Sequence, residues 1–333
     1  MPKRLESRIC LTLRIVKLKI LASIVVPTFN RSHEVRRLLE DILRQTESNF
    51  EVLIVDDGSD SANLAQYRKL IAEFGDRFLF VEKSQNDTGR GPGASRNRGI
   101  RMARGTYVLF CDDDDRWIRE DHLAFGCHAL DHSDADLFWA DMQTATNGEV
   151  LNPSMYGGFS FLRSNQIAGL EDTFDVDRKS MSRFLRHRII HCDSLVVRRS
   201  ILDSASLYWE PLKYAEDHDF CFRLADKAKK SLYRNLPVAE LNVAPHISVA
   251  RSMDSVDRLL FGVLALKHIE IVVVDEGLIS AARANQSWKL VELGEVLSGA
   301  KNKGAIRRLF KDSFFLNPSI RGFALLIKAF LKR

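Results

Sequence analysis

Strand-like and helix-like segments alternate regularly from residue 21 onward, and this alternation restricts the chain to few architectures. Short apolar runs rich in β-branched residues are typical of buried strands, and apolar residues at a helical spacing are typical of amphipathic helices. The expected strands cover residues 22–27, 51–55, 78–82 and 106–111, and the expected helices cover residues 32–43, 64–74 and 94–103. This repeated order predicts an α/β fold with a doubly wound, mostly parallel sheet.

Polar residues follow three of these strands directly. Thr28, Phe29 and Asn30 follow the first strand, Asp56 and Asp57 follow the second, and a run from Asp112 to Asp115 follows the fourth. The carboxyl ends of parallel strands meet at one edge of a sheet, where ligands of such folds bind. We therefore expect a ligand site built from these three segments.

The pattern loosens after Asp141. Residues 144–190 look loop-rich and suit a substrate-facing region, and a strand near 194–197, a helix over 217–229 and a strand-like segment over 237–243 then resume the order. From Val256 the chain reads as helices only. We divide it into a basic segment over 1–20, a catalytic domain over 21–250 with halves over 21–115 and 116–250, and a helical region over 251–333.

Charge is distributed unevenly along the 333 residues. Residues 1–20 carry six basic residues against one acidic residue, and residues 300–333 carry nine against one. The rest of the chain holds 34 basic and 42 acidic residues, although the whole chain has a formal net charge of +5. Because a body that binds nucleic acid is usually basic, we expect no nucleic-acid partner.

The cysteines and the apolar runs indicate in which cellular compartment the protein is expected. Five scattered cysteines without a CxxC pair argue against a disulfide framework or a structural zinc site and fit a reducing environment. No uninterrupted apolar run reaches the roughly 18 residues that a membrane-spanning helix needs, and the basic N-terminus lacks a signal-peptide cleavage site. We expect a cytoplasmic protein.

The four adjacent aspartates Asp112–Asp115 are the strongest chemical signal. Adjacent carboxylates repel one another unless a cation neutralises them, and hard oxygen ligands suit Mg²⁺ or Mn²⁺. The alternative is a solvated acidic turn. We favour a metal site because the run directly follows a buried strand.

Other motifs allow two interpretations each. Asp56 and Asp57 precede Gly58 and Ser59, which is also the composition of an ordinary turn. The stretch from Arg90 to Gly93 is neither a P-loop nor a dinucleotide fingerprint, but glycines before a helix could admit a phosphate beside Arg90 or Arg96. The acidic residues Glu216, Asp217 and Asp219 suit ordinary capping of a first helical turn, and a lone histidine such as His246 is more often structural.

Several motifs together resemble family 2 glycosyltransferases of the GT-A fold over residues 21–250. They are SIVVPTFNR (23–31), VDDGS (55–59), GPGASRNRGI (91–100), GTYVLFCDDDDRW (105–117), DSLVVRRSIL (193–202) and AEDHDFCFRL (215–224). The resemblance implies an inverting enzyme that moves a sugar from a nucleoside diphosphate, most simply UDP, to an acceptor hydroxyl. It identifies the first half of the domain as nucleotide-sugar-binding and the second as the acceptor half.

Site roles can be carried over position by position. The nucleotide sugar would contact Pro27, Thr28, Phe29, Asp56, Asp57, Asp112 and Asp113, with Arg90 and Arg96 as further candidates. Asp112, Asp114 and His246 would hold Mn²⁺ or Mg²⁺, and Asp217 would be the catalytic base. Arg119 replaces a common proline and Ser59-Asp60-Ser61 replaces a common STD, which affects local geometry only. No QxxRW motif is present, which argues against a processive synthase.

The last residues carry their own signal. Residues 318–333 place apolar residues on one helical face and cations elsewhere, which suits an interfacial helix on an anionic membrane. The alternative is a helix packed on the catalytic domain. With a glycan or lipid-linked acceptor, the enzyme would act in surface polysaccharide or lipopolysaccharide synthesis, peripherally on the inner face of the membrane. The alternative functions are a sugar-1-phosphate nucleotidyltransferase, whose N-terminal GxGxRL-type loop is missing, and an inactive binding relative.

Overall fold

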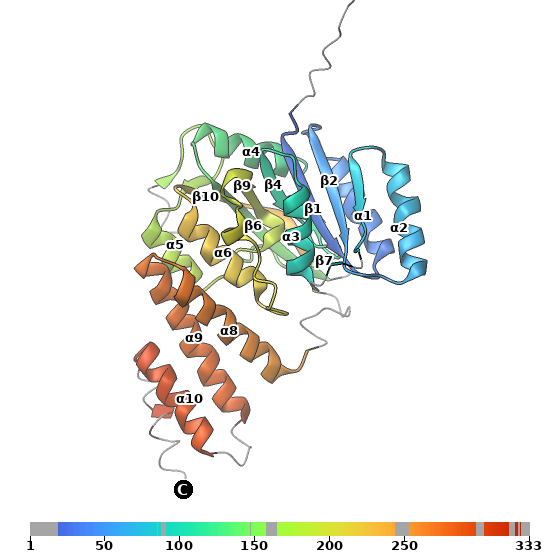
Figure 1. The fold of residues 1–333 in the computed structure, drawn as a ribbon. Coiled ribbons are helices and arrows are strands. Elements are labelled where there is room, and N and C mark those ends of the chain that lie inside the picture. Colours follow the sequence, from blue (N-terminus) through green and yellow to red (C-terminus); the bar gives the residue numbers. More distant parts are fainter. Residues whose placement is uncertain are drawn as a thin grey trace, which may run out of the picture.

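The computed structural model describes residues 19–84, 86–87, 91–146, 148–157, 165–243, 253–297, 303–319, 324–325 and 327. In this part of the chain, ten strands form one sheet in the order β3-β2-β1-β4-β9-β6-β10-β5, with β7 paired to β6 and β8 paired to β10 (Figure 1). The expected α/β fold with a mostly parallel sheet is confirmed, because six of these ten strands run in one direction.

The N-terminal half follows the expected alternation. Its strands are β1 (Ala22–Thr28), β2 (Phe50–Asp56), β3 (Phe78–Val81) and β4 (Tyr107–Phe110), all parallel, and its helices are α1 (Ser32–Leu43), α2 (Ser61–Phe74) and α3 (Pro92–Met102). The chain first adds strands on one side of β1 and then crosses to place β4 on the other side. This reversal between β1 and β4 is the position where doubly wound folds bind ligands.

The C-terminal half differs from the expectation in two ways. The strand expected near 194–197 is β9 (Leu195–Arg198), and it runs antiparallel to both of its neighbours, β4 and β6 (Leu137–Thr146). The region 144–190, expected to be loop-rich, has loops over most of its described residues but also contains the end of β6 together with β7 (Glu149–Asn152), β8 (Thr173–Asp175) and α5 (Arg178–Leu185). The remaining elements of this half are β5 (Arg116–Trp117), α4 (His122–His132), the short 3₁₀ turn η2 (Cys192–Ser194), α6 (Glu216–Lys227) and β10 (Ser231–Asn242).

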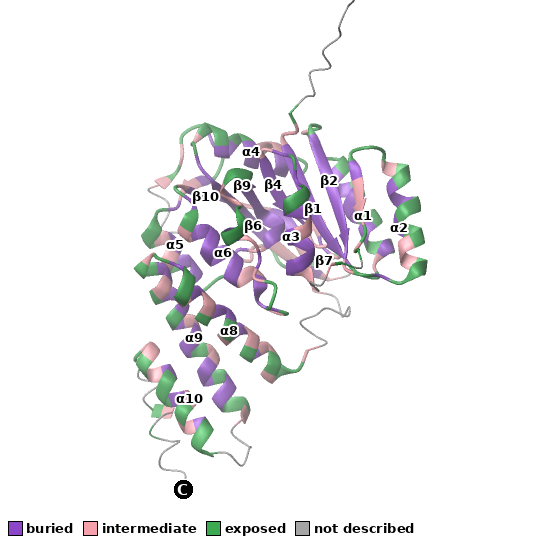
Figure 2. Cartoon of the chain, in the orientation of Figure 1, coloured by how far each residue is buried: buried purple, intermediate pink, exposed green. Residues whose placement is uncertain are grey.

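Two apolar cores cover the two faces of the sheet. Along β1, Ile24 and Val26 point to a core shared with α1, α2 and α4, whereas Val25 points to a core shared with α3, α5 and α6. The period-two alternation of a strand produces this division. Both faces of the central strands are therefore buried, and their carboxyl ends are left to build a site (Figure 2).

The helical region begins with α8 (Ser255–Val272), α9 (Glu276–Val296) and α10 (Lys303–Leu316). Leu266 of α8 and Leu278 of α9 join the core beneath α5 and α6, and the helices then extend away from the sheet (Figure 1). Among the described residues, no helix is both long and apolar enough to cross a membrane. Residues 1–18 and most of the expected interfacial helix over 318–333 lie outside the described residues.

Candidate active site

The polar segments expected at the sheet edge meet there. Thr28 ends β1, Asp56 ends β2, and the run from Asp112 follows β4, so all three segments lie around the reversal between β1 and β4. The backbone N–H of Asp57 donates to the carbonyl of Thr28 over 2.9 Å, which joins the first two segments.

The middle of the aspartate run is held by the end of β1. The hydroxyl of Thr28 donates to Asp113 Oδ2 over 2.7 Å, and Arg31 Nη1 lies 2.7 Å from both Asp113 Oδ1 and Asp114 Oδ2. Burial raises the pKa of Asp113 to about 7, with the charge of Asp114 adding to this and Arg31 opposing it. The run is therefore a partly buried cluster held by hydrogen bonds and ion pairs, and not a solvated turn.

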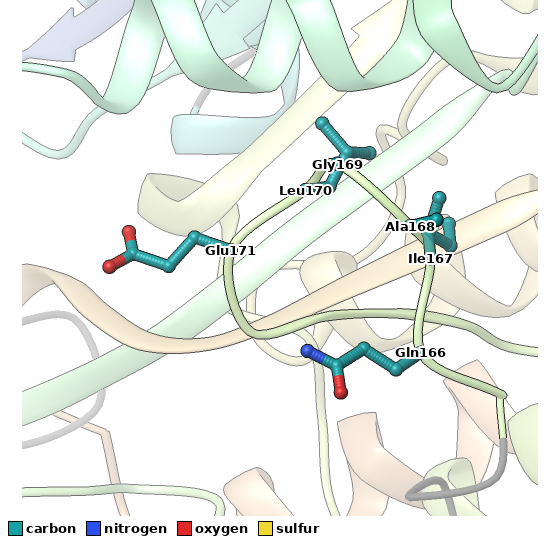
Figure 3. A pocket seen from close by; sticks show the side chains of 6 residues that line it. All are labelled: Gln166, Ile167, Ala168, Gly169, Leu170 and Glu171. Carbon is teal, nitrogen blue, oxygen red and sulfur yellow. The ribbon is translucent and has the colours of Figure 1, made fainter.

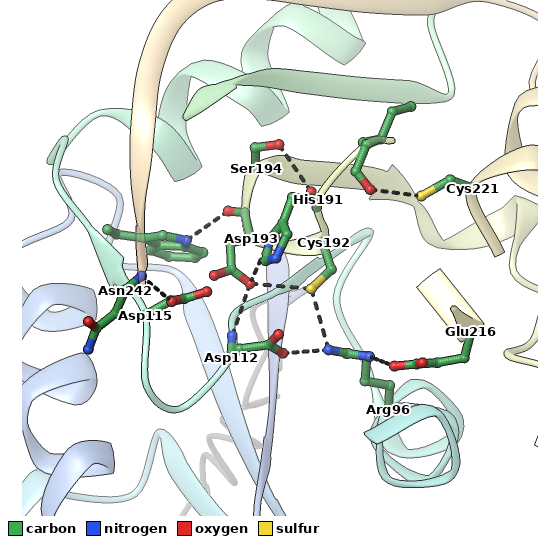
Figure 4. A network of polar contacts seen from close by, with 12 residues as sticks. Arg96, Asp112, Asp115, His191, Cys192, Asp193, Ser194, Glu216, Cys221 and Asn242 are labelled. Carbon is green, nitrogen blue, oxygen red and sulfur yellow. Dashed lines mark hydrogen bonds and ion pairs between the residues drawn. The ribbon is translucent and has the colours of Figure 1, made fainter. Parts of the chain in front are cut away.

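The two ends of the run contact other elements (Figure 4). The backbone N–H of Asp112 donates to Asp193 Oδ1 over 3.0 Å, and Asp115 Oδ1 accepts the N–H of Asn242 over 2.8 Å. Burial raises the pKa of Asp112, but the guanidinium of Arg96, 2.5 Å from Asp112 Oδ1, lowers it below its usual value. Burial and the neighbouring Asp193 carboxyl raise the pKa of Asp115.

The residues around Asp112 fit a divalent cation. Ligand atoms of Asp112, Asp115 and His191 all lie within 4.8 Å of one another. The two carboxylates suit Mn²⁺ or Mg²⁺, and the imidazole favours a transition metal ion such as Mn²⁺. His191 was not among the expected ligands, although it lies only two residues before the motif that begins at Asp193. The predicted ligand His246 lies outside the described residues.

The residues expected to contact the nucleotide base differ in exposure. Pro27 is buried within β1, and the hydroxyl of Thr28 lies 2.7 Å from that of Tyr67 as well as contacting Asp113. Phe29 instead exposes 53% of its surface at the sheet edge. An exposed aromatic ring beside a polar site offers a stacking surface for a planar base.

Asp56 and Asp57 shape the loop between β2 and α2. Asp56 is buried and accepts the N–H groups of Gly58 and Ser59, as expected for a turn. Asp57 pairs with Lys83 over 3.2 Å and accepts the N–H of Gly91 over 2.6 Å, at the start of α3. This geometry fits the turn interpretation for Asp56, while Asp57 joins β2 to the glycine-rich stretch.

Arg96 lies between the two halves of the domain and not on an open phosphate site. Its side chain is 3% exposed, and its Nη1 lies 3.1 Å from Glu216 Oε1 while its Nη2 contacts Asp112. Burial and the adjacent charge of Asp217 raise the pKa of Glu216 to about 7. Arg90, the other candidate phosphate contact, lies outside the described residues.

The first turn of α6 presents three carboxylates with different surroundings. Ala215, which precedes the helix, has a φ of 61°, an uncommon conformation for a residue with a side chain. Glu216 pairs with Arg96, and Asp219 is fully buried between Arg223 and His268, with His268 Nδ1 2.6 Å from Asp219 Oδ1. Asp217 is partly exposed, and its Oδ1 accepts the N–H of His218.

A separate hollow of about 430 Å³ is lined by the consecutive residues 166–171 (Figure 3). Its carboxylate, Glu171, pairs with Arg234 over 2.6 Å. None of its lining residues belongs to the cluster at the sheet edge, so we assign it no part in the site.

Comparison with known proteins identifies the family. The model of glycosyl transferase family 2 matches residues 23–202, more than half of the chain, and the chain belongs to this family. An uncharacterised glycosyltransferase of Haemophilus influenzae is 43% identical over 98 residues, which are 29% of this chain and 31% of that relative. WfgD of Escherichia coli, a UDP-Glc:α-D-GlcNAc-diphosphoundecaprenol β-1,3-glucosyltransferase, is 26% identical over 60% of this chain and 67% of its own length.

Solved structures share the fold. Residues 1–349 of TarS from Staphylococcus aureus superpose with a TM-score of 0.64 at 20% identity, covering 92% of this chain and 83% of that one. The mannosyltransferase PcManGT of Pyrobaculum calidifontis, solved with GDP-Man and Mn²⁺, gives a TM-score of 0.58 at 17% identity over 92% and 78% of the two chains. The expectation of a GT-A glycosyltransferase fold is confirmed.

Proposed function

We propose that the protein is an inverting, metal-dependent glycosyltransferase that moves a sugar from a UDP-sugar to an acceptor hydroxyl. The observation that carries this proposal is the position of Arg96, which contacts Asp112 of the aspartate run and Glu216 beside Asp217. One side chain thus connects the cation-binding cluster to the carboxylate turn of α6. The reaction requires both groups next to each other.

Asp217 is the base in this proposal. An acceptor hydroxyl is a weak nucleophile, so a carboxylate must accept its proton as the new bond to the sugar forms. Asp217 is partly exposed, whereas Asp219 is buried between Arg223 and His268. Attack from the face opposite the leaving diphosphate would invert the anomeric centre.

The opposite end of the site would hold the donor. Asp112 and Asp114 of the run, with Asp115, His191 and the predicted ligand His246, would hold Mn²⁺ or Mg²⁺. The bound cation would neutralise negative charge on the departing diphosphate as a Lewis acid. Phe29 would stack on the base, and Pro27, Thr28, Asp56, Asp57 and Asp113 would shape the nucleoside pocket around it.

UDP and a lipid-linked acceptor are the specific substrate classes that we propose. TarS 1–349 has been solved in complex with UDP-GlcNAc, and the name of WfgD describes a UDP-sugar donor and a diphosphoundecaprenol-linked acceptor. A lipid-linked acceptor would place the enzyme peripherally at the inner face of the membrane, in surface polysaccharide or lipopolysaccharide synthesis. The amphipathic segment over 318–333 would provide the attachment.

A thermal-shift experiment tests the donor site. UDP and a panel of UDP-sugars should raise the melting temperature in Mn²⁺ or Mg²⁺ and much less in EDTA, since a ligand at 100 times its Kd stabilises by about 2.7 kcal/mol. Asp114→Ala in Mn²⁺ should behave like the wild-type protein in EDTA. Equal stabilisation by UDP with and without the metal would contradict the assignment of the aspartate run.

A further inference from the structure

Arg31 occupies a position that a cation would be expected to take. It lies between β1 and α1, and its Nη1 is 2.7 Å from Asp113 Oδ1 and 2.7 Å from Asp114 Oδ2. A single nitrogen therefore contacts two neighbouring carboxylates of the run. Its backbone N–H donates to the hydroxyl of Tyr67 over 2.7 Å, so the base of the side chain is fixed.

The guanidinium of Arg31 and its two carboxylate partners differ in their exposure to solvent. The side chain of Arg31 is 25% exposed and that of Asp114 is 21% exposed, whereas Asp113 is only 6% exposed. The contact with Asp113 is therefore sheltered, while the contact with Asp114 faces solvent. A ligand arriving from solvent can reach Asp114 and the guanidinium without unfolding the strand end.

We propose that Arg31 is the resident counter-cation of Asp113 and Asp114, in the middle of the aspartate run, and couples the binding of the divalent cation to that of the nucleoside diphosphate. This inference rests on the proposed function. Without nucleotide, the positive charge of Arg31 neutralises Asp114 and repels a second cation. A nucleoside diphosphate offers the guanidinium another anionic partner of the kind that arginine binds best.

The coupling has a defined thermodynamic consequence. Mn²⁺ alone should bind weakly, and UDP should increase its affinity because the diphosphate relieves the repulsion by Arg31. Since linkage is reciprocal, Mn²⁺ must increase the affinity for UDP by the same factor. Removal of the arginine charge should raise the affinity for Mn²⁺ alone and reduce this coupling factor.

The experiment is a titration of Mn²⁺ in which the electron paramagnetic resonance signal of the free ion is followed, with and without UDP. Arg31→Ala should bind Mn²⁺ alone about tenfold more tightly than the wild type, because a unit charge at contact distance has been removed. The increase caused by UDP should shrink by a similar factor. Arg36→Ala is the matched control, since it removes an exposed cation of α1, the helix that follows Arg31; Arg36 pairs with Glu73, and its removal should change neither value.

The outcomes separate the inference from the proposed function. Unchanged or weaker binding of Mn²⁺ alone to Arg31→Ala would overturn the role of Arg31, even if wild-type protein binds UDP with Mn²⁺. Failure of the wild-type protein to bind UDP in the presence of Mn²⁺ would instead overturn the proposed function. If Arg31→Ala does not fold, Arg31→Gln removes the charge while keeping a neutral donor, and the same expectations apply to it.

Discussion

Arg96 shows how burial changes what a residue can do. Its position in the first turn of a helix that follows a glycine-rich stretch suggested a phosphate contact, but the structure places it 3% exposed between Asp112 and Glu216. A buried guanidinium with two carboxylate partners fixes their relative position, and removing one member of such a set leaves a buried charge uncompensated. Arg96 therefore sets the geometry between the aspartate run and α6.

Asp217→Asn should separate binding from chemistry. The amide keeps the size of the side chain but cannot accept a proton, so sugar transfer should fall by about 10²-fold or more. The affinity for UDP should stay within a few-fold, because the proposed role of Asp217 is toward the acceptor. Release of UDP from the donor in the presence of acceptor measures the first quantity, and thermal shift measures the second.

Asp219→Asn is the informative comparison for that variant. Asp219 contacts Arg223 and His268, so this change should lower thermal stability more than it lowers turnover. An Asp217→Asn enzyme that keeps most of its turnover would show that another carboxylate of this turn, Glu216 or Asp219, is the base.

Glu216 should make stability depend on pH. Its pKa in the folded protein is about 7, above its ordinary value of 4.5, so between these values the folded state holds a proton that the unfolded state has lost. The free energy of unfolding should therefore decrease as pH rises from about 4.5 and level off above pH 7. Glu216→Gln should reduce this dependence of the unfolding free energy on pH, measured by urea unfolding at pH 5, 6, 7 and 8 in EDTA. A smaller dependence of the same sign should remain, because the pKa of Asp113 is also raised.

At the level of elements, α3 depends on its close approach to β1. A Cβ at Gly99 would lie 2.4 Å from Val25 Cγ1, which is shorter than any ordinary contact. An Ala at this position would improve helix propensity by up to about 1 kcal/mol, but overpacking should instead reduce stability by about 1–3 kcal/mol. We expect Gly99→Ala to unfold at lower urea concentration than the wild type.

Met102→Ala provides the control in the same helix. Met102 is 49% exposed, and its truncation should change stability by no more than about 0.5 kcal/mol. If Gly99→Ala were as stable as the wild type, α3 would have to sit farther from the sheet than the structure places it. Because α3 carries Arg96, such a shift would also alter the site.

Helices and strands with a clear local pattern of apolar residues could be predicted from the sequence. Strands β1, β2 and β4 and helix α1 were found because short apolar runs alternate with amphipathic segments. Helix α4 was missed, and its N-terminus has no side-chain cap. Strand β6 was missed because Asp141 interrupts its apolar run, although the first six residues of the strand are all buried.

Long-range features could not be read from local patterns. The antiparallel direction of β9 depends on pairing with β4 and β6, and the positions of Arg31 and His191 in the site depend on elements that meet only in the folded chain. The catalytic roles of Asp114, His246 and Asp217 remain predictions.

At the scale of the whole molecule, the basic C-terminus predicts attachment to anionic membranes. Deletion of residues 317–333 should weaken binding to anionic liposomes, since each of the four cations removed contributes about 1 kcal/mol near such a surface. Arg307 and Arg308 of α10 remain, so we expect partial loss, greater at high salt. Cosedimentation measures the binding, and hydrolysis of the donor in solution should be unchanged.

Two results would contradict this interpretation. Full-length protein that binds neutral and anionic liposomes equally poorly would exclude electrostatic attachment. A lower melting temperature after the deletion, without any change in binding, would show that these residues pack on the catalytic domain.

The contacts of Arg96 and Asp193 limit how such enzymes can be recombined. A chimaera joined between residues 115 and 116 would take Arg96 and Asp112 from one parent and Asp193 and Glu216 from the other. The exchanged half must therefore supply a carboxylate that pairs with Arg96 and an oxygen that accepts the N–H of Asp112. Without both contacts, the two halves of the domain would lose their relative position. We expect that exchanging this half transfers acceptor specificity only between parents that share both contacts.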